Sequence, residues 1–384
     1  MYKRYLELNL PKGKSCFLWG PRQTGKTTYL KRRFPESVYY DFLKRDLHIE
    51  FLKEPNRLRG EIAALPEGRL ESPIILDEIQ KIPELLDEIH WIIENIGAGF
   101  ILSGSSARKL RRGHVNLLGG RAWRFNLFPL TSEELGGDFD LLRALNNGLI
   151  PVHYGEDDPG RSLKAYVLDY LKEEIFDEGL TRNLAAFSRF LDIAGYSNAS
   201  LVNYTNIARE CGVDAKTVRE YFQILQDTLV GTLVEPFQKR AGRAIIRKTP
   251  KFYFFDTGVA NQISKTIIQE PKGELFGRSL EHLTHMELAA YASYSEKDFD
   301  ITFWRTKYGQ EVDFVLGDGE VAIEVKGKKR ISNSDLKHLK LFDELHAPKK
   351  SFLVSLEERE RRCGNSTVLN WRIFLKKLWN GEII

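Results

Sequence analysis

Residues 20–28 read GPRQTGKTT, a glycine-rich loop whose composition is typical of phosphate binding. Gly20, Gly25, Lys26 and Thr27 complete the pattern GxxxxGK[ST]. Glycines let the backbone wrap phosphates, so that successive N–H groups point inward at the positive end of the next helix. We expect Lys26 on the β- and γ-phosphates of ATP and the Thr27 hydroxyl on Mg²⁺. The residues expected to contact nucleotide are Gly20, Pro21, Arg22, Gln23, Thr24, Gly25, Lys26, Thr27 and Thr28.

Two carboxylates follow a second apolar run. Residues 73–76 are apolar and lead directly into Asp77 and Glu78. We expect Asp77 to hold Mg²⁺ through its water shell and Glu78 to polarise the attacking water. The pair therefore predicts hydrolysis of ATP, with Lys26 and Glu78 as catalytic residues. A solvated turn is the alternative for adjacent carboxylates, and the upstream loop argues against it.

Two further positions suit phosphate chemistry. Ser103 lies in the predicted strand 99–104, where a small hydroxyl would sense the γ-phosphate, and Ser105 is the second choice. Arg121 is predicted to be a catalytic arginine finger for a neighbouring subunit's nucleotide, with a surface arginine as the alternative. A basic loop between them is interpreted as a solvated charge run rather than a binding site: Arg108, Lys109, Arg111 and Arg112.

Acidic residues and a lysine recur near the end of the chain, in EVDFVLGDGEVAIEVK (311–326). Alternation along a strand places Glu324 and Lys326 on one face, and Asp313 lies on the preceding strand. Carboxylates that hold Mg²⁺ or Mn²⁺ beside a lysine are typical of phosphodiester cleavage. Glu281, on the preceding helical stretch, completes this predicted catalytic set, with Asp313 and Glu324 as metal ligands and Glu287 as the second choice for Glu281. The alternative is an amphipathic hairpin with paired surface charges; His282 and His285 are interpreted as ordinary helix residues.

Residues 204–229 predict a helix–turn–helix with Asp214 as the N-cap of its longer helix. The outward residues of that helix are Lys216, Thr217, Arg219, Glu220 and Gln223. Between Pro236 and Lys251 the chain has six basic residues and no acidic one, namely Lys239, Arg240, Arg243, Arg247, Lys248 and Lys251. A helix–turn–helix followed by a basic hairpin has the outline of a winged helix and predicts contacts with the DNA backbone. A protein-binding module is the alternative.

Strands and helices alternate through the first part of the chain, which predicts βαβ units and a parallel sheet. The expected strands are 15–20, 37–42, 73–78, 99–104 and 122–130, and the expected helices begin after Gly25, near 45–54 and at 84–96. Thr131 to Glu134 has the spacing of a capping box and predicts another helix. The whole is an α/β multidomain chain, divided into a nucleotide-binding domain (1–165), a helical and winged-helix domain (166–260) and a last α/β domain (261–384).

Composition narrows the class of protein. Of 384 residues, 42% are hydrophobic and 29% charged, which excludes collagen-like, coiled-coil and largely disordered chains. The net charge is 57 − 53 = +4, too small by itself to indicate nucleic acid. No run approaches the ~20 apolar residues of a membrane span, and Cys16, Cys211 and Cys363 show no CxxC spacing. We therefore expect a cytoplasmic protein without a membrane partner.

Taken together, the motifs resemble those of archaeal and bacterial P-loop ATPases that join an AAA-type domain to a C-terminal region called DUF4143. The segments that carry the resemblance are GPRQTGKTT, IILDEIQ, ILSGSS, LGGRAWRF, PLTSEEL, KFYFFDTG, FWRTKYGQEVDFVL and IEVKGKK. The resemblance implies an additional-strand P-loop fold, a winged helix and a domain similar to the PD-(D/E)xK nucleases and Holliday-junction resolvases. It also implies ATP with Mg²⁺ and a homo-oligomer.

Two interpretations of the whole chain follow. In the first, an Mg²⁺-dependent ATPase binds DNA through its middle domain and cleaves or processes branched or end-containing DNA through its last domain. In the second, ATP controls a DNA- or protein-binding switch, including a transcription regulator, whose last domain is not catalytic.

Overall fold

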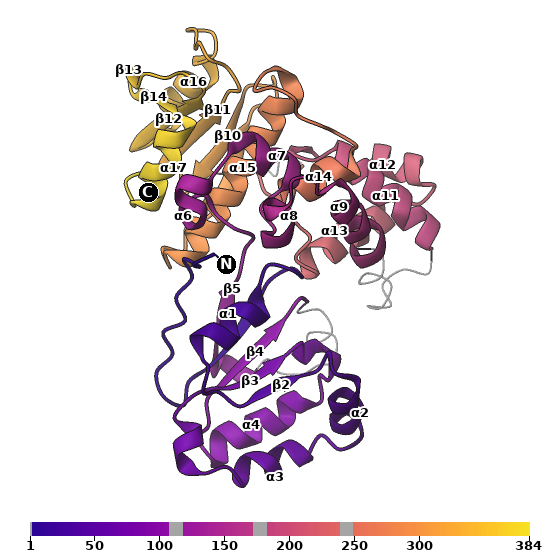
Figure 1. The fold of residues 1–384 in the computed structure, drawn as a ribbon. Coiled ribbons are helices and arrows are strands. Elements are labelled where there is room, and N and C mark those ends of the chain that lie inside the picture. Colours follow the sequence, from indigo (N-terminus) through magenta and orange to yellow (C-terminus); the bar gives the residue numbers. More distant parts are fainter. Residues whose placement is uncertain (1, 107–117, 172–182, 239–248) are drawn as a thin grey trace. The chain divides into compact units, whose positions relative to one another are not determined.

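Five short strands between residues 15 and 126 form one parallel sheet (Figure 1). The strands are β1 (Ser15–Trp19), β2 (Tyr39–Asp41), β3 (Ile74–Asp77), β4 (Phe100–Gly104) and β5 (Ala122–Asn126). Their order in the sheet is β2-β3-β4-β1-β5, so β4 lies between the strand before the glycine-rich loop and the strand that ends at Asp77. The predicted N-terminal parallel α/β sheet is confirmed. Because parallel strands end at the same edge, the loop after β1 and the carboxylates after β3 lie at one edge of the sheet.

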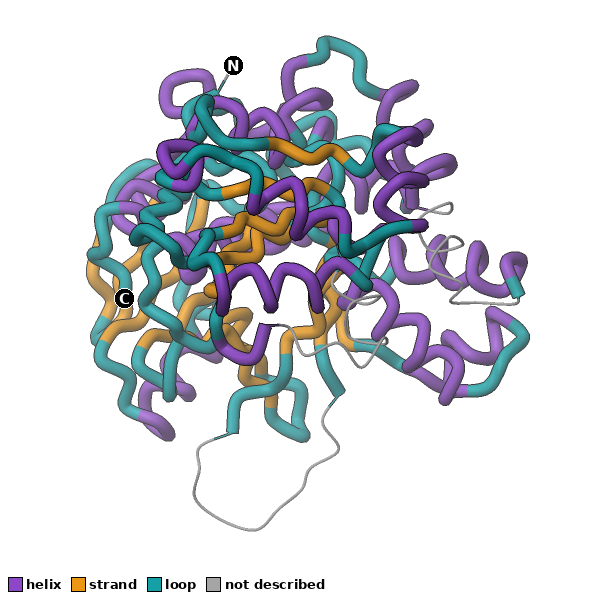
Figure 2. Tube along the Cα trace, turned by 90° about the horizontal axis from the view of Figure 1, so that it is seen from below, coloured by secondary structure: helices purple, strands orange, loops and turns teal. Residues whose placement is uncertain are grey.

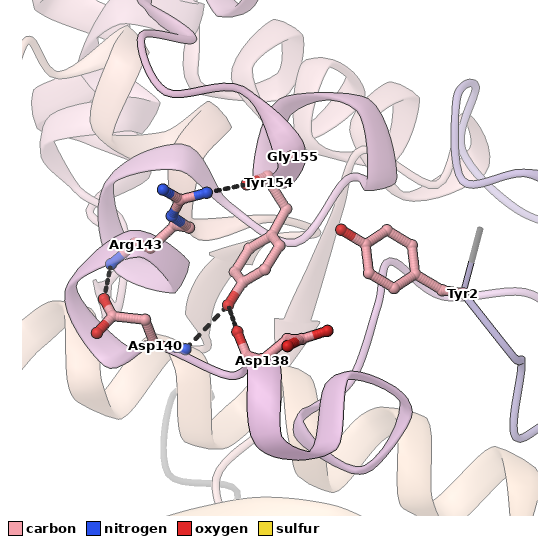
Figure 3. Close-up of a pocket in the computed structure, with 6 residues that line it drawn as sticks. All are labelled: Tyr2, Asp138, Asp140, Arg143, Tyr154 and Gly155. Carbon is pink, nitrogen blue, oxygen red and sulfur yellow. Dashed lines mark hydrogen bonds between the residues drawn. The ribbon is translucent and has the colours of Figure 1, made fainter.

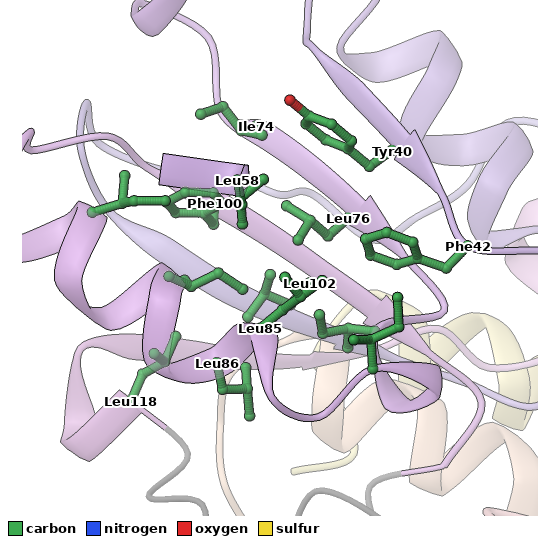
Figure 4. Close-up of a cluster of buried hydrophobic side chains, with 14 of the residues drawn as sticks. Tyr40, Phe42, Leu58, Ile74, Leu76, Leu85, Leu86, Phe100, Leu102 and Leu118 are labelled. Atoms are coloured by element: carbon green, nitrogen blue, oxygen red, sulfur yellow. The ribbon is translucent and has the colours of Figure 1, made fainter. Parts of the chain in front are cut away.

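Helices cover both faces of this sheet (Figure 1). They are α1 (Lys26–Arg33), α2 (Arg45–Lys53), α3 (Arg57–Ala63) and α4 (Leu85–Asn95), with short 3₁₀ turns at Glu67–Leu70, Ile79–Lys81 and Leu118–Gly120. Alternate residues of β1, β3 and β4 pack with α2, α3 and α4 in one apolar core (Figure 4). Helix α3 was not predicted, because its seven residues bury only Leu58 and Ile62 and show too little periodicity.

The computed structural model describes residues 2–106, 118–171, 183–238 and 249–384, and it divides into two compact units. The first unit consists of Leu6–Phe128 together with a short distant segment, Asp227–Val230. Leu229 of that segment packs against the core described above. The second unit consists of Met1–Tyr5, Pro129–Gln226 and Gly231–Ile384. The predicted division at residues 165 and 260 stays a prediction.

The second unit begins with short helices. These are α6 (Ser132–Leu135), α7 (Leu141–Asn147), α8 (Pro151–Gly155), α9 (Gly160–Ala165) and a π-helical turn (Tyr166–Leu171), with a 3₁₀ turn at Gly136–Asp138. The predicted capping box is confirmed, since Thr131 accepts a hydrogen bond from the Glu134 N–H and the Glu134 side chain accepts one from the Thr131 N–H.

Four further helices in the described ranges and a small antiparallel sheet follow. Figure 2 shows the described helices of the whole chain in purple and the strands in orange. The helices are α11 (Leu184–Tyr196), α12 (Tyr204–Cys211), α13 (Ala215–Asp227) and α14 (Thr257–Ile263). The strands β6 (Ser200–Leu201), β7 (Gly231–Val234) and β8 (Lys251–Phe254) form a sheet of order β6-β8-β7. The side chain of Asp214 accepts a hydrogen bond of 2.7 Å from the Thr217 N–H and caps α13 as predicted.

The last part of the chain is a six-stranded mixed sheet with helices on its faces. Its elements are α15 (Gly273–Tyr294), β9 (Ile301–Arg305), β10 (Glu311–Leu316), β11 (Val321–Val325), α16 (Lys337–His346), β12 (Lys350–Ser355), β13 (Arg361–Cys363), β14 (Ser366–Asn370) and α17 (Trp371–Trp379). The strand order is β13-β14-β12-β11-β10-β9. Strands β9, β10 and β11 are antiparallel neighbours, whereas β11, β12 and β14 run parallel. In the described ranges, no helix is long and apolar enough to cross a membrane.

Candidate functional site

The glycine-rich loop joins the end of β1 to the start of α1. A Cβ atom at Gly20 would lie 2.5 Å from the Leu127 carbonyl oxygen, so a larger residue cannot fit there without a shift of the backbone. Gly25 caps α1 with φ of 94°, a left-handed conformation that favours glycine. These two positions explain in physical terms why the motif requires glycine at each of its ends.

Lys26 is buried within this loop. Its Nζ donates hydrogen bonds to the carbonyl oxygens of Gly20 at 2.7 Å and Pro21 at 3.0 Å. The Thr24 hydroxyl donates to the same Pro21 carbonyl at 2.8 Å. The loop therefore closes around the ammonium group, and phosphate oxygens can take the place of these carbonyls as acceptors. Gln23 and Thr28 are exposed at the rim, and Arg22 is half-buried.

Asp77 lies at the carboxyl end of β3 and collects three hydroxyl groups. Thr27 Oγ1 donates to Asp77 Oδ2 at 2.6 Å, and the Tyr39 hydroxyl donates to the same oxygen at 2.5 Å. Ser103, paired with Asp77 across β3 and β4, donates to Asp77 Oδ1. Burial and the neighbouring Asp77 carboxylate raise the pKa of Tyr39, so this phenol keeps its proton and acts as a donor. The pairing of Thr27 with Asp77 places both predicted Mg²⁺ residues side by side.

Glu78 follows Asp77 in a left-handed conformation with φ of 62°. Its side chain is buried, and Gln80 Nε2 donates to Glu78 Oε2 at 2.5 Å. The Ser105 hydroxyl lies 3.3 Å from the same oxygen and accepts from Gln80 Nε2 at 3.1 Å. The sequence therefore missed Gln80 and Tyr39 as partners of the two carboxylates. Two signals in the sequence could have indicated them. Gln80 follows Asp77 and Glu78 closely, and Tyr39 lies on the strand that pairs with β3.

The remaining predicted residues of this region lie elsewhere or outside the described ranges. Arg121 precedes β5, whose first residue pairs with Ser15, so it lies at the opposite edge of the sheet from the glycine-rich loop. Its Nε is 2.5 Å from Glu94 Oε1. Arg121 is therefore not part of this chain's own nucleotide site. The basic loop Arg108, Lys109, Arg111 and Arg112 lies outside the described residues.

This donor set fits ATP with Mg²⁺. A buried ammonium, a hydroxyl next to a carboxylate, and a glycine-capped helix N-terminus converge on one edge of the sheet. Hydroxyl and carboxylate oxygens are the ligands that Mg²⁺ prefers, and backbone N–H groups with an ammonium bind phosphate.

A second group of charged residues lies in the larger unit. Asp313 and Glu324 face each other across β10 and β11, since Phe314 pairs with Ile323 in that antiparallel ladder. The Val325 N–H donates to Asp313 Oδ2 at 2.8 Å, and Lys326 is ion-paired with Glu324 Oε1. Burial and Asp313 raise the pKa of Glu324 well above its ordinary value. The predicted strand residues are thus brought together.

A lysine that was not predicted for this site joins it. Lys251 Nζ lies 2.9 Å from Glu281 Oε1, 2.6 Å from Glu311 Oε1 and 3.5 Å from Asp313 Oδ1. The Tyr253 hydroxyl donates to Glu281 Oε1 at 2.6 Å. Burial and the Asp313 carboxylate raise the pKa of Glu281 to about 7. We call Lys251, Glu281, Glu311, Asp313, Glu324 and Lys326 the carboxylate cluster.

The carboxylate cluster does not fit the predicted Mg²⁺ or Mn²⁺. Among the residues that the structure describes, no group of three or more His, Cys, Asp or Glu is arranged to hold a metal ion. The physical reason is that the Lys251 ammonium lies between Glu281, Glu311 and Asp313 and repels a second cation. Lys251 itself had been predicted to face DNA phosphates, which is wrong because it is only 2% exposed.

Other residues considered for this site have structural partners. Glu287 lies apart and accepts hydrogen bonds from the Ser132 N–H at 2.7 Å and the Trp379 indole N–H at 2.7 Å. His282 Nδ1 lies 3.0 Å from Asn198 Nδ2, and His282 Nε2 lies 2.6 Å from the Phe254 carbonyl oxygen. Burial lowers the pKa of His282 to about 4 and that of His285 to about 3, so both are neutral at pH 7.

The predicted DNA-binding helix α13 presents a mixed surface. Lys216, Arg219, Glu220 and Gln223 are exposed, and the Arg219 guanidinium lies 4.8 Å from the centre of the Tyr204 ring. Val218, Phe222 and Leu225 recur at spacings of four and three, and all three are buried on α13. Leu229, which the same periodicity places on this helix, lies beyond its end at Asp227 and packs against the core of the other unit. Five of the six basic residues predicted for the hairpin lie outside the described residues, namely Lys239, Arg240, Arg243, Arg247 and Lys248.

A cavity of about 630 Å³ lies beside α7 and α8 (Figure 3). The Tyr154 hydroxyl donates to the Asp138 carbonyl at 2.6 Å and accepts from the Asp140 N–H at 2.9 Å. Arg143 donates to the Tyr154 carbonyl at 3.3 Å and contacts Asp157 at 3.3 Å. Tyr154, Asp140 and Arg143 thus bind one another or the backbone around the cavity.

Comparison with known proteins agrees with the N- and C-terminal motifs. Residues 12–136 match the family described as "AAA domain", and residues 276–374 match a domain of unknown function, DUF4143. Residues 139–269 match another domain of unknown function, DUF8612. These matches confirm the predicted join of an AAA-type ATPase domain to a DUF4143 region. No curated protein matches the chain.

The solved structures that match parts of this chain include two archaeal proteins. A Walker-type ATPase of Pyrococcus abyssi is 15% identical, with 65% of this chain and 90% of that chain covered and a TM-score of 0.42. The Orc1 protein of Aeropyrum pernix, solved in complex with DNA, is 15% identical, with 66% and 86% covered and a TM-score of 0.23.

Proposed function

We propose that this chain, in which an AAA-type P-loop ATPase domain is joined to a DUF4143 region, binds Mg²⁺–ATP at residues 20–28 and hydrolyses it to ADP and phosphate. The observation that carries the proposal is the hydrogen bond of 2.6 Å between Thr27 and Asp77 beside the buried Lys26. This contact joins the helix after the loop to the strand that ends in the two carboxylates.

Each residue has a role that its contacts support. Lys26 and the N–H groups at the start of α1 bind the phosphates, since the ammonium already lies inside the loop. Thr27 and Asp77 would hold Mg²⁺, with Tyr39 and Ser103 fixing the orientation of the Asp77 carboxylate. Mg²⁺, when bound, supplies positive charge to the phosphate oxygens.

Glu78 is the proposed general base. Its carboxylate would orient a water and accept a proton from it, and Gln80 with Ser105 holds that carboxylate in place. Ser103 is kept as a positioning residue, because its hydroxyl is directed to Asp77. Arg121 can serve only a neighbouring subunit's nucleotide, which requires a homo-oligomer and the release of Glu94.

Phosphate release tests the proposal. The purified full-length protein with ATP and Mg²⁺ should release inorganic phosphate continuously, and excess EDTA should stop the release. Binding of a fluorescent ATP analogue without any phosphate release, at several protein concentrations to allow for assembly, would limit the site to nucleotide binding.

We propose, as a second function, that α12 and α13 with the following hairpin bind DNA. The order α11, β6, α12, α13, β7 and β8 supports a winged helix, since a strand separates the first two helices and two paired strands follow the third. Exposed Lys216 and Arg219 add positive charge to α13. Because Glu220 lies among them, backbone binding is a better proposal than recognition of one sequence.

The triple variant Arg243→Ala, Arg247→Ala and Lys248→Ala should weaken DNA binding to a similar extent for unrelated sequences. Each lost phosphate contact lowers the slope of log K against log salt by about 0.9, so the slope should fall by up to about 2.7. Fluorescence anisotropy with labelled duplexes at several salt concentrations measures both quantities.

A matched control removes the same charge elsewhere. We call the unit of Leu6–Phe128 and Asp227–Val230 the ATPase unit. Arg32, Lys53 and Arg69 are exposed residues of this unit, and their replacement by Ala should leave affinity and slope nearly unchanged. An equal loss in both triple variants would mean that net charge alone is responsible, and no loss in either would favour protein docking.

For the DUF4143 region we propose the non-catalytic interpretation rather than DNA cleavage. The Lys251 ammonium between Glu281, Glu311 and Asp313 supports it, because a cleavage site needs that space for a divalent ion. Together with the ATPase, this describes an ATP-controlled binding switch.

A further inference from the structure

The carboxylate cluster joins elements that are distant in sequence. Lys251 begins β8, where it pairs with Leu201 of β6 and Val234 of β7. Its acceptors come from helix α15 (Glu281) and strand β10 (Glu311 and Asp313). One side chain therefore connects the small antiparallel sheet to the last mixed sheet.

The geometry matches an ammonium ion. A lysine ammonium has three N–H donors, and three carboxylates lie within 3.5 Å of Lys251 Nζ. Burial would lower the pKa of Lys251, but Tyr253 and the carboxylates raise it well above its ordinary value, so the side chain stays charged. The ion pairs are internal, since only 3% of the Lys251 side chain is exposed.

One carboxylate oxygen of the cluster has no hydrogen-bond donor among the described residues. Glu324 Oε2 is buried and has no hydrogen-bond partner in the part of the chain that the structure describes. Glu324 lies opposite Asp313, and Lys326 binds its other oxygen. Glu324 Oε2 could act as a ligand for a second cation near Asp313. The ammonium of Lys251, however, repels a divalent ion from the carboxylates that Lys251 contacts.

We propose that Lys251 is the permanent cation of the carboxylate cluster, in the position that a divalent ion would otherwise take. A neutral side chain at residue 251 then converts the cluster into a site for Mg²⁺ or Mn²⁺. The Lys251 ammonium and a divalent ion exclude each other because both bind Asp313 and Glu281. Mg²⁺ in addition requires ligand oxygens at about 2.1 Å, which leaves no room for an ammonium group between them. This inference concerns the last domain and is independent of ATP hydrolysis.

Mn²⁺ titration of nucleotide-free, full-length protein, followed by the EPR signal of free Mn²⁺, tests the proposal. Wild type and Asp313→Asn should bind Mn²⁺ equally, because the wild-type cluster takes no metal. Lys251→Met should bind one additional Mn²⁺ per chain, at least about tenfold more tightly than any wild-type site. The double variant Lys251→Met with Asp313→Asn should lose that additional ion.

Thermal unfolding gives a second readout. Without metal, Lys251→Met should lower Tm by about 5 °C or more, since it leaves buried carboxylates unpaired, and Mn²⁺ should restore much of that loss. The control Lys349→Met removes an exposed ion pair with Glu320 and should change neither Tm nor Mn²⁺ binding appreciably.

Two results would overturn the proposal. One is an Mn²⁺ ion bound by wild type and lost in Asp313→Asn, which would show a metal coexisting with Lys251. The other is a folded Lys251→Met or Lys251→Gln protein that gains no Mn²⁺. If neither Lys251 variant folds, comparing Mn²⁺ binding by wild type and Asp313→Asn still tests whether the wild-type cluster holds a metal ion.

Discussion

Replacement of Glu78 by Gln should preserve ATP binding and lower the rate of hydrolysis by about 10²- to 10⁴-fold, the usual contribution of a general base. The amide has nearly the shape of the carboxylate but cannot accept a proton from water. Thr27, Asp77 and Lys26 keep their contacts in this variant, so phosphate and Mg²⁺ binding should survive. Phosphate release and the affinity for a fluorescent ATP analogue measure the two properties separately.

Glu84→Gln is the matched control for Glu78→Gln. Glu84 is an exposed glutamate at the start of α4, and its loss should leave hydrolysis unchanged. Hydrolysis at the wild-type rate in Glu78→Gln would remove Glu78 from the mechanism. Loss of ATP binding in this variant would instead mean that Glu78 and Gln80 maintain the shape of the site.

Replacement of Lys26 by Ala should abolish detectable turnover and weaken ATP binding by on the order of a hundredfold to a thousandfold. Each charge-assisted hydrogen bond contributes about 1.5–3 kcal/mol, and we propose that the ammonium binds oxygens of two phosphate groups. In the structure its donors bind the Gly20 and Pro21 carbonyls. Calorimetric titration with ATP and Mg²⁺ measures the affinity.

Circular dichroism must accompany that measurement, because Lys26 is only 5% exposed and its loss also removes two loop contacts. The control Lys53→Ala removes an exposed lysine from α2 and should bind and hydrolyse ATP like wild type. A folded Lys26→Ala protein with unchanged ATP affinity would place the nucleotide somewhere other than residues 20–28.

The parts of the fold that the sequence predicts best are those with local signals. Strand β1, the glycine-rich loop and α1 are contiguous, and β1, β3 and β4 are short, largely apolar runs in which every residue is buried. Strand β13 was not predicted, because it has three residues and its position depends on pairing with β14. Such pairing has no signal within the segment itself. Strand β14 and helix α17 were also not predicted, although the buried residues of α17 follow a helical spacing.

The candidate sites show the same limit. Thr27 and Asp77 meet as predicted, because parallel strands bring their carboxyl ends to one edge. Tyr39 reaches Asp77 only because β2 is the neighbour of β3, and strand order cannot be read from the motif. Lys251 was assigned to a basic hairpin by composition, whereas its acceptors lie 30 or more residues later in the chain.

The segment Asp227–Val230 has a consequence for the dissection of this protein. These four residues belong to the same compact unit as Leu6–Phe128, although about a hundred residues of the other unit separate them in sequence. Leu229 packs against the apolar core of the ATPase unit, and Thr228 and Val230 are each 1% exposed. A fragment that stops at Phe128 would expose the apolar surface that this segment covers, so it is expected to aggregate more readily than the whole chain. The ATPase unit is thus built from two separate stretches of the sequence. A fragment that contains only this unit needs residues 227–230 attached through a designed linker.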